Sequence, residues 1–121
     1  MKVLIADDSI TMRRIIAGML GELGYRDIVE VDCGEDCLRA LGAHGDVGLA
    51  LLDWNMPLMN GLDCLKAIRG NPETAATPVV IVTSDASKSS VMEALRSGAN
   101  SYLIKPFVVE KLKEIIDGLK K

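Results

Sequence analysis

The chain has 121 residues, of which 49% are hydrophobic and 26% charged, and its formal net charge is −3. This length and composition are typical of one compact domain spanning residues 1–121 and exclude a disordered chain. The acidic balance argues against a nucleic-acid-binding surface, and no apolar run is long enough to cross a membrane.

Short apolar runs alternate along the chain with stretches whose apolar residues recur every three or four positions. The predicted strands cover residues 3–6, 28–31, 49–52, 79–82 and 101–104. A helix is predicted after each strand. The first is expected to end at Gly24, the second at Gly42, the third near Gly70 and the fourth at Gly98. The last helix is expected to carry Lys120 and Lys121 at its end, where the helix dipole favours cations.

This alternation predicts a parallel sheet with helices on both faces, because strands joined through helices are normally parallel. The runs at 3–6, 49–52 and 79–82 are apolar throughout, as expected for central strands buried on both faces. Glu30 interrupts the second run and the fifth is half polar, which is typical of edge strands. The predicted fold is therefore a flavodoxin-like (βα)5 three-layer α/β sandwich with strand order 2-1-3-4-5.

Reactive side chains follow the apolar strands. Asp7 and Asp8 follow the first strand, Asp53 follows the third, Thr83 the fourth and Lys105 the fifth. In a parallel sheet all carboxyl ends lie along one edge, so we expect these side chains to converge there. Asp32 follows the second strand, but an edge position places it too far away to join them.

Three converging carboxylates repel one another, at roughly 4 kcal/mol for each pair about 4 Å apart. Such a cluster needs protons or a cation, and few carboxylates with room for water suit Mg²⁺. Lys105 and Thr83 add groups that bind a phosphoryl anion. A carboxylate can itself accept a phosphoryl group, and Asp53 is the best candidate because it lies centrally.

Each of these residues also has an ordinary structural explanation when taken alone. Asp and Ser are favoured helix N-caps, Asp53 fits a turn, and Lys105 fits a solvated charge. Their joint placement at the strand ends favours a shared site. Arg13 and Arg14 are expected on a solvated helix face, and the three cysteines are expected to be free thiols in a cytoplasmic protein.

Four segments of the sequence resemble those of a known family: "ADDSITMRR", "LLDWNMPLMNG", "VVIVTS" and "YLIKPF". They resemble the response-regulator receiver domains of bacterial two-component signalling, and most of all the single-domain chemotaxis regulators of the CheY type. The resemblance covers essentially the whole chain, so residues 1–121 are expected to form a single receiver domain.

The resemblance implies that Asp53 takes a phosphoryl group from the phosphohistidine of a histidine kinase. It implies Mg²⁺ held by Asp8, Asp53 and the main-chain carbonyl of Asn55, with Asp7 reaching the ion through water. It also implies that Lys105 and Thr83 bind phosphoryl oxygens.

Further positions follow from the same resemblance. Tyr102 matches an aromatic switch residue that acts together with Thr83, and the bond before Pro106 is implied to be cis. Asp85 stands where many members have Glu, and Asn60 stands where many have Asp. Asp85 and Asn55 are implied to affect the lifetime of the phosphorylated state.

The predicted function is a phosphorylation-activated signalling switch in chemotaxis or flagellar motor control. It is not a conventional enzyme, although it assists the phosphorylation and dephosphorylation of its own Asp. Output is expected through a protein-binding face made by the fourth helix, fifth strand and fifth helix, from a monomer that binds a histidine kinase and a downstream protein such as a flagellar motor switch.

Three alternatives remain open at this stage. The chain fits a receiver module of another two-component pathway, or one cut from a longer regulator. A phosphohydrolase with an Asp nucleophile would need a second acid two residues after Asp53, where Asn55 stands. A flavin carrier would need aromatic residues and a phosphate loop after the first strand, where the sequence is acidic.

Overall fold

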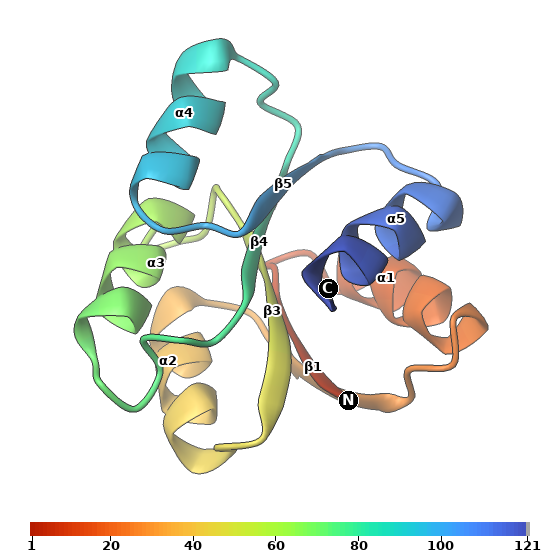
Figure 1. Ribbon diagram of the computed structural model, residues 1–121, viewed down its shortest axis with the longest axis horizontal. Coiled ribbons are helices and arrows are strands. Elements are labelled where there is room, and N and C mark those ends of the chain that lie inside the picture. The colour runs from red at the N-terminus through yellow and green to blue at the C-terminus, as the bar shows by residue number, and fades with distance from the viewer. Residues whose placement is uncertain (121) are drawn as a thin grey trace.

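The computed structural model describes residues 1–120, so Lys121 of the sequence prediction lies outside the described residues. Strands and helices alternate along the chain (Figure 1). Their bounds are β1 Lys2–Ala6, α1 Ile10–Glu22, β2 Asp27–Val31, α2 Gly34–Ala43, β3 Val47–Asp53, α3 Gly61–Gly70, β4 Val79–Thr83, α4 Lys88–Arg96, β5 Ser101–Ile104 and α5 Val109–Leu119.

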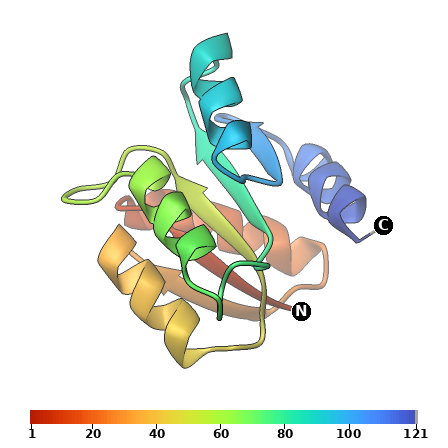
Figure 2. The same cartoon turned by 60° about the vertical axis from the view of Figure 1, so that its left-hand side comes forward.

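The five strands form one parallel sheet in the order β2-β1-β3-β4-β5, which confirms the predicted fold. Figures 1 and 2 show α1 and α5 on one face of the sheet and α2, α3 and α4 on the other. The register pairs Asp53 of β3 with Val82 of β4, and so brings the carboxyl ends of the two strands together.

The core has two halves, one on each face of the sheet. Successive residues of a strand point to opposite faces, so Leu4 packs under α2 and α3 while Ile5 packs under α1 and α5. Both side chains are fully buried. This two-sided burial explains why β1, β3 and β4 are apolar over residues 3–6, 49–52 and 79–82, whereas β2 has no buried residue and β5 has one.

Most predicted helix ends are confirmed, but one is wrong. Gly24 and Gly98 follow α1 and α4 with φ angles of +93° and +108°, the left-handed conformation that ends helices. Gly42, however, lies inside α2, which continues to Ala43 because the His44 N–H donates to Ala40 O. A glycine lowers helix propensity without forbidding another residue of helix.

None of the helices within residues 1–120 has the length and apolar character needed to cross a membrane.

Candidate functional site

The carboxyl ends of β1, β3, β4 and β5 supply the side chains of one site. Asp7 directly follows β1, Asp53 is the last residue of β3, Thr83 is the last residue of β4, and Lys105 directly follows β5. Asp53 and Thr83 therefore belong to the strands rather than to the turns after them. Their backbones are paired within the sheet, Asp53 with Val82 and Thr83 with Ile104.

Three carboxylates and one ammonium meet at this edge. Asp7, Asp8 and Asp53 each place an oxygen within 4.8 Å of the other two. Lys105 Nζ lies 2.9 Å from Asp7 Oδ2 and 3.5 Å from Asp53 Oδ1. The residues predicted to converge from four strand ends thus include four that lie within direct interaction range.

The site is buried at its base and open at one side. Asp7 and Asp53 are only 2% and 7% exposed, whereas Asp8 is exposed. Burial raises the pKa of the Asp53 carboxyl above its ordinary value; the Lys105 ammonium opposes this rise and the Asp7 carboxylate adds to it. The charged form of Asp53 has therefore lost hydration that its neighbours replace only in part.

A divalent cation fits this donor set. Three carboxylates and one ammonium leave a formal charge of −2, from −3 and +1. The donors are hard oxygens, and exposed Asp8 leaves room for water, which suits Mg²⁺. Asn55 is exposed beside them, and its N–H donates to Asp53 Oδ1 at 3.4 Å.

Asp32 does not belong to this group. It lies with Cys33 and Asp36 in a second acidic cluster at the end of β2, as the edge position predicted.

The three predicted thiols are free, with Cys37 and Cys64 fully buried in the core under α2 and α3.

Thr83, Asp85 and Tyr102 form a connected group next to the carboxylates. Thr83 is fully buried, and its Oγ1 accepts the N–H of Asp85 at 3.2 Å. The Tyr102 hydroxyl donates to the carbonyl oxygen of the same Asp85. The Lys105–Pro106 peptide bond beyond β5 is cis.

The side chain of Asp85 binds the start of α4. Its Oδ1 accepts the Ser87 N–H at 2.9 Å and its Oδ2 accepts the Ser90 hydroxyl at 2.7 Å. These bonds hold the pKa of Asp85 below its ordinary value, with the Ser90 hydroxyl as the largest cause. Asp85 therefore links Thr83, Tyr102 and α4 at once.

Two residues lie against the backbone of the site residues and were not predicted to do so. Gly61 starts α3 where a Cβ would lie 2.5 Å from the carbonyl oxygen of Asp53, so only glycine fits without a shift. Arg13 is not on a solvated helix face: its side chain is 14% exposed and donates to the carbonyl oxygen of Asp7 at 2.7 Å. Arg14 is exposed, as expected.

Known proteins match this chain over nearly its whole length. The family model described as "Response regulator receiver domain" matches residues 3–117. The chain is 42% identical to the chemotaxis protein CheY1 of Helicobacter pylori, covering 97% of this chain and 94% of that protein. It is 43% identical to the chemotaxis protein CheY-3 of Vibrio cholerae, covering 98% and 91%.

A solved structure agrees with these sequence relatives. The chemotaxis protein CheY4 of Vibrio cholerae superposes with a TM-score of 0.89 at 30% identity, covering 98% of this chain and 97% of that chain. Fold, site geometry and sequence relatives lead to one conclusion: the chain belongs to the response regulator receiver domain family, and within it is of the CheY type.

Proposed function

We propose that this receiver domain is a switch activated when Asp53 accepts a phosphoryl group from the phosphohistidine of a histidine kinase. The observation that carries the proposal is the position of Lys105 Nζ, 2.9 Å from Asp7 Oδ2 and 3.5 Å from Asp53 Oδ1. An ammonium between a buried nucleophile and a neighbouring carboxylate is placed to bind the oxygens of an incoming phosphoryl group.

Asp8, Asp53 and the Asn55 carbonyl would hold Mg²⁺, with Asp7 reaching it through water. The net formal charge of −2 at the site supports a divalent ion. When bound, the ion supplies neutralising charge for phosphoryl oxygens. Asp7 also keeps Lys105 in place, because the Asp7–Lys105 contact is the shorter of the two that the ammonium makes.

Asp53 supplies the nucleophilic oxygen. Its Oδ1 accepts the Asn55 N–H and lies near Lys105, so we assign the attack to the other oxygen, Oδ2. The Oδ2–P bond forms as the bond between phosphorus and the donor histidine nitrogen breaks, and the electron pair of that bond returns to the nitrogen. Lys105 and the Thr83 hydroxyl bind the transferred oxygens.

Asp85 connects this event to the rest of the molecule. The Thr83 hydroxyl has one proton to donate to a phosphoryl oxygen and keeps lone pairs for the Asp85 N–H. A shift of Thr83 toward the phosphoryl group therefore moves Asp85, and with it the carbonyl that Tyr102 binds and the carboxylate that binds Ser90. We expect two residues to set the lifetime of the phosphorylated state: Asp85, and Asn55, whose N–H donates to Asp53.

The proposed output face lies next to Asp85 and Tyr102, the residues that these shifts would move. A hollow of about 570 Å³ joins the β4–α4 loop, α4, β5 and α5, and it is lined by Ala86, Val91, Tyr102, Ile104, Pro106, Phe107, Val108 and Lys111. Tyr102 is in its wall, so a change in its packing reshapes the hollow. The downstream partner is a signalling protein, and the chemotaxis relatives favour a flagellar motor switch.

The test is phosphorylation by a small acyl phosphate with Mg²⁺, followed by the intact mass of the protein. We expect a gain of one phosphoryl group that is labile in acid and base. Asp53→Asn should abolish it, and Asp32→Asn, directly after the edge strand β2, should leave it unchanged.

Other outcomes identify the alternatives. Continuous turnover of phosphate esters without a stable mass gain would favour a phosphohydrolase, and a yellow purified protein would favour a flavin carrier. An unmodified mass under conditions in which a related receiver domain is phosphorylated would refute the proposal.

A further inference from the structure

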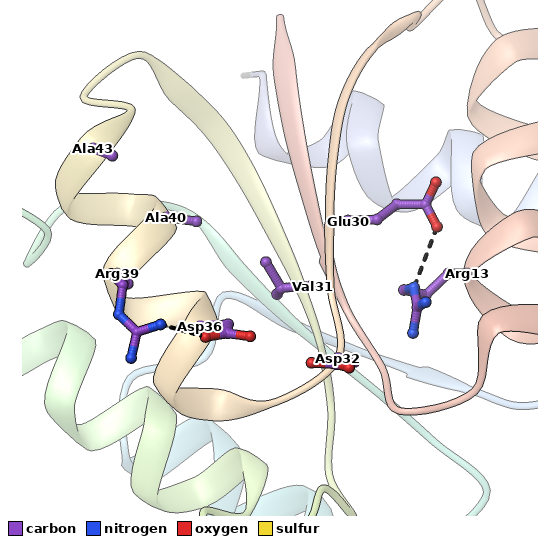
Figure 3. Close-up of a pocket in the computed structure, with 8 residues that line it drawn as sticks. All are labelled: Arg13, Glu30, Val31, Asp32, Asp36, Arg39, Ala40 and Ala43. Atoms are coloured by element: carbon purple, nitrogen blue, oxygen red, sulfur yellow. Dashed lines mark hydrogen bonds and ion pairs between the residues drawn. The ribbon is translucent and has the colours of Figure 1, made fainter.

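Arg13 crosses from α1 to the end of β1 and to β2. Its Nη1 donates to the carbonyl oxygen of Asp7 at 2.7 Å, and its Nε donates to Glu30 Oε1 at 3.3 Å. Figure 3 shows the Arg13–Glu30 pair at one side of a hollow of about 450 Å³, with the Asp36–Arg39 pair on α2 at the other side. Arg13 therefore joins three elements through one guanidinium group.

The oxygen that Arg13 binds belongs to the peptide between the two acidic residues. That peptide is planar, so a contact that holds its carbonyl oxygen holds the orientation of the plane that links the Cα atoms of Asp7 and Asp8. The Asp7 N–H is held by Val31 O at 3.1 Å, and β1 pairs with β2 only as far as Ala6 and Val31. Beyond that point the Asp7 carbonyl is held by Arg13.

The Asp7 side chain is held on both oxygens. Oδ1 accepts the Ser9 N–H at 2.9 Å and Oδ2 accepts Lys105 Nζ at 2.9 Å. Both bonds depend on the course of the backbone through Asp7 and Asp8, which the Arg13 contact fixes. Groups that orient metal ligands typically change metal affinity by about 10- to 100-fold when removed.

The Arg13–Glu30 ion pair adds little net charge to the site, because the Glu30 carboxylate offsets the Arg13 guanidinium. A positioning role of Arg13 can be distinguished from an effect of its charge by the direction in which Mg²⁺ affinity changes. Loss of a cation near three carboxylates favours binding of Mg²⁺, whereas loss of ligand positioning weakens it. The two roles predict opposite signs for the same substitution.

We propose that Arg13 is a positioning residue, which holds the Asp7–Asp8 turn so that both carboxylates face the cation site. This inference rests on the proposed function for its Mg²⁺ readout. Arg13 acts through the backbone of Asp7 and touches no reacting atom.

The experiment is a Mg²⁺ titration followed by the fluorescence of Trp54, the one tryptophan in the sequence and the residue after Asp53. We expect Arg13→Met to raise the Kd for Mg²⁺ about tenfold. Arg14→Met removes the same charge from the exposed neighbouring position and should leave the Kd unchanged or slightly lower. An Arg13→Met protein that binds Mg²⁺ as tightly as the unchanged protein, or more tightly, would overturn the inference.

Hydrogen exchange of the Ser9 amide tests the same role of Arg13 without metal. The Ser9 amide donates to Asp7 Oδ1, so its hydrogen exchange in EDTA should accelerate in Arg13→Met and not in Arg14→Met. Urea unfolding checks that the variants are folded; if Arg13→Met is not, the polar and uncharged Arg13→Gln takes its place with the same expectations. A lower unfolding midpoint with unchanged Kd and unchanged Ser9 exchange would assign Arg13 a purely structural role.

The outcomes also separate the inference from the proposed function. If the unchanged protein shows no response to Mg²⁺, the metal site of the proposed function fails, and Ser9 exchange still decides whether Arg13 holds the turn. If the unchanged protein binds Mg²⁺ and Arg13→Met matches it, the inference alone fails.

Discussion

Burial of the Asp53 carboxyl disfavours its charged form, and this costs stability wherever the carboxyl is ionised. The residue is 7% exposed, and burial raises its pKa above the ordinary value for a free carboxyl. Between the ordinary and the raised pKa, the folded state binds more protons than the unfolded state. The contribution of Asp53 to the free energy of unfolding therefore falls as the pH rises through this window.

Asp53→Asn should accordingly stabilise the metal-free protein. The substitution removes one of three mutually repelling carboxylates, while Lys105 keeps its 2.9 Å contact with Asp7. We expect the free energy of unfolding at neutral pH to rise by on the order of 1 kcal/mol. Urea unfolding in EDTA, repeated from about pH 4 to about pH 7, should show that the advantage of the variant grows with pH. A difference that is constant over this range would contradict the assignment.

At the scale of elements, the junction of β3 and α3 positions the loop that carries Asn55. The Gly61 N–H donates to Trp54 O at 2.9 Å, and the helix start lies against the last residue of the strand. A side chain at Gly61 would collide with backbone atoms of Asp53 and Trp54, which have no flexible end to move aside. The loop between them would have to shift.

Gly61→Ala should therefore destabilise the fold by about 1–3 kcal/mol and weaken Mg²⁺ binding. The matched control is Gly42→Ala, inside α2, where a Cβ meets no atom within 4 Å. That change should stabilise the protein by roughly 0.5–1 kcal/mol, because alanine favours helix. Thermal unfolding measures both effects. Equal effects of the two substitutions would show that the close approach at Gly61 is unimportant.

At the scale of the whole molecule, folding itself brings together the carboxylates of the proposed cation site. Asp8 and Asp53 are 45 positions apart in the sequence, from 53 − 8, and the sheet brings their oxygens within 4.8 Å. The unfolded chain has no such cluster, so Mg²⁺ should bind the folded state selectively. Binding then stabilises the fold by mass action.

Saturating Mg²⁺ should raise the melting temperature. At a concentration 100-fold above Kd the expected gain is about 2.7 kcal/mol, or roughly 10 °C for a chain of this size. EDTA should reverse the shift, and Asp8→Asn should remove most of it, because Asp8 is a proposed ligand. The same Mg²⁺ shift in Asp8→Asn and in the unchanged protein would indicate general ionic effects rather than this site.

The sequence by itself determined the fold and the convergence of Asp7, Asp8, Asp53 and Lys105 at one edge of the sheet. Apolar runs on both faces of β1, β3 and β4, and polar residues in β2 and β5, were sufficient to order the strands. Parallel strands all end at one edge, so the residues after β1, β3 and β5 were expected to meet there, whereas Asp32 after the edge strand β2 lies in a separate cluster. The spacing of apolar residues along the chain reveals the strands and their ends, because strands and helices each have a characteristic residue period.

Only the tertiary structure decided how these residues are held. Arg13 contacts Asp7 and Glu30, Gly61 touches the backbone of Asp53, and Asp85 binds Ser90 on α4. Helical spacing places Arg13 on a turn of α1 without revealing that a carbonyl and a carboxylate from two strands lie within its reach. Such contacts depend on the distances between packed elements, which no local pattern of residues encodes.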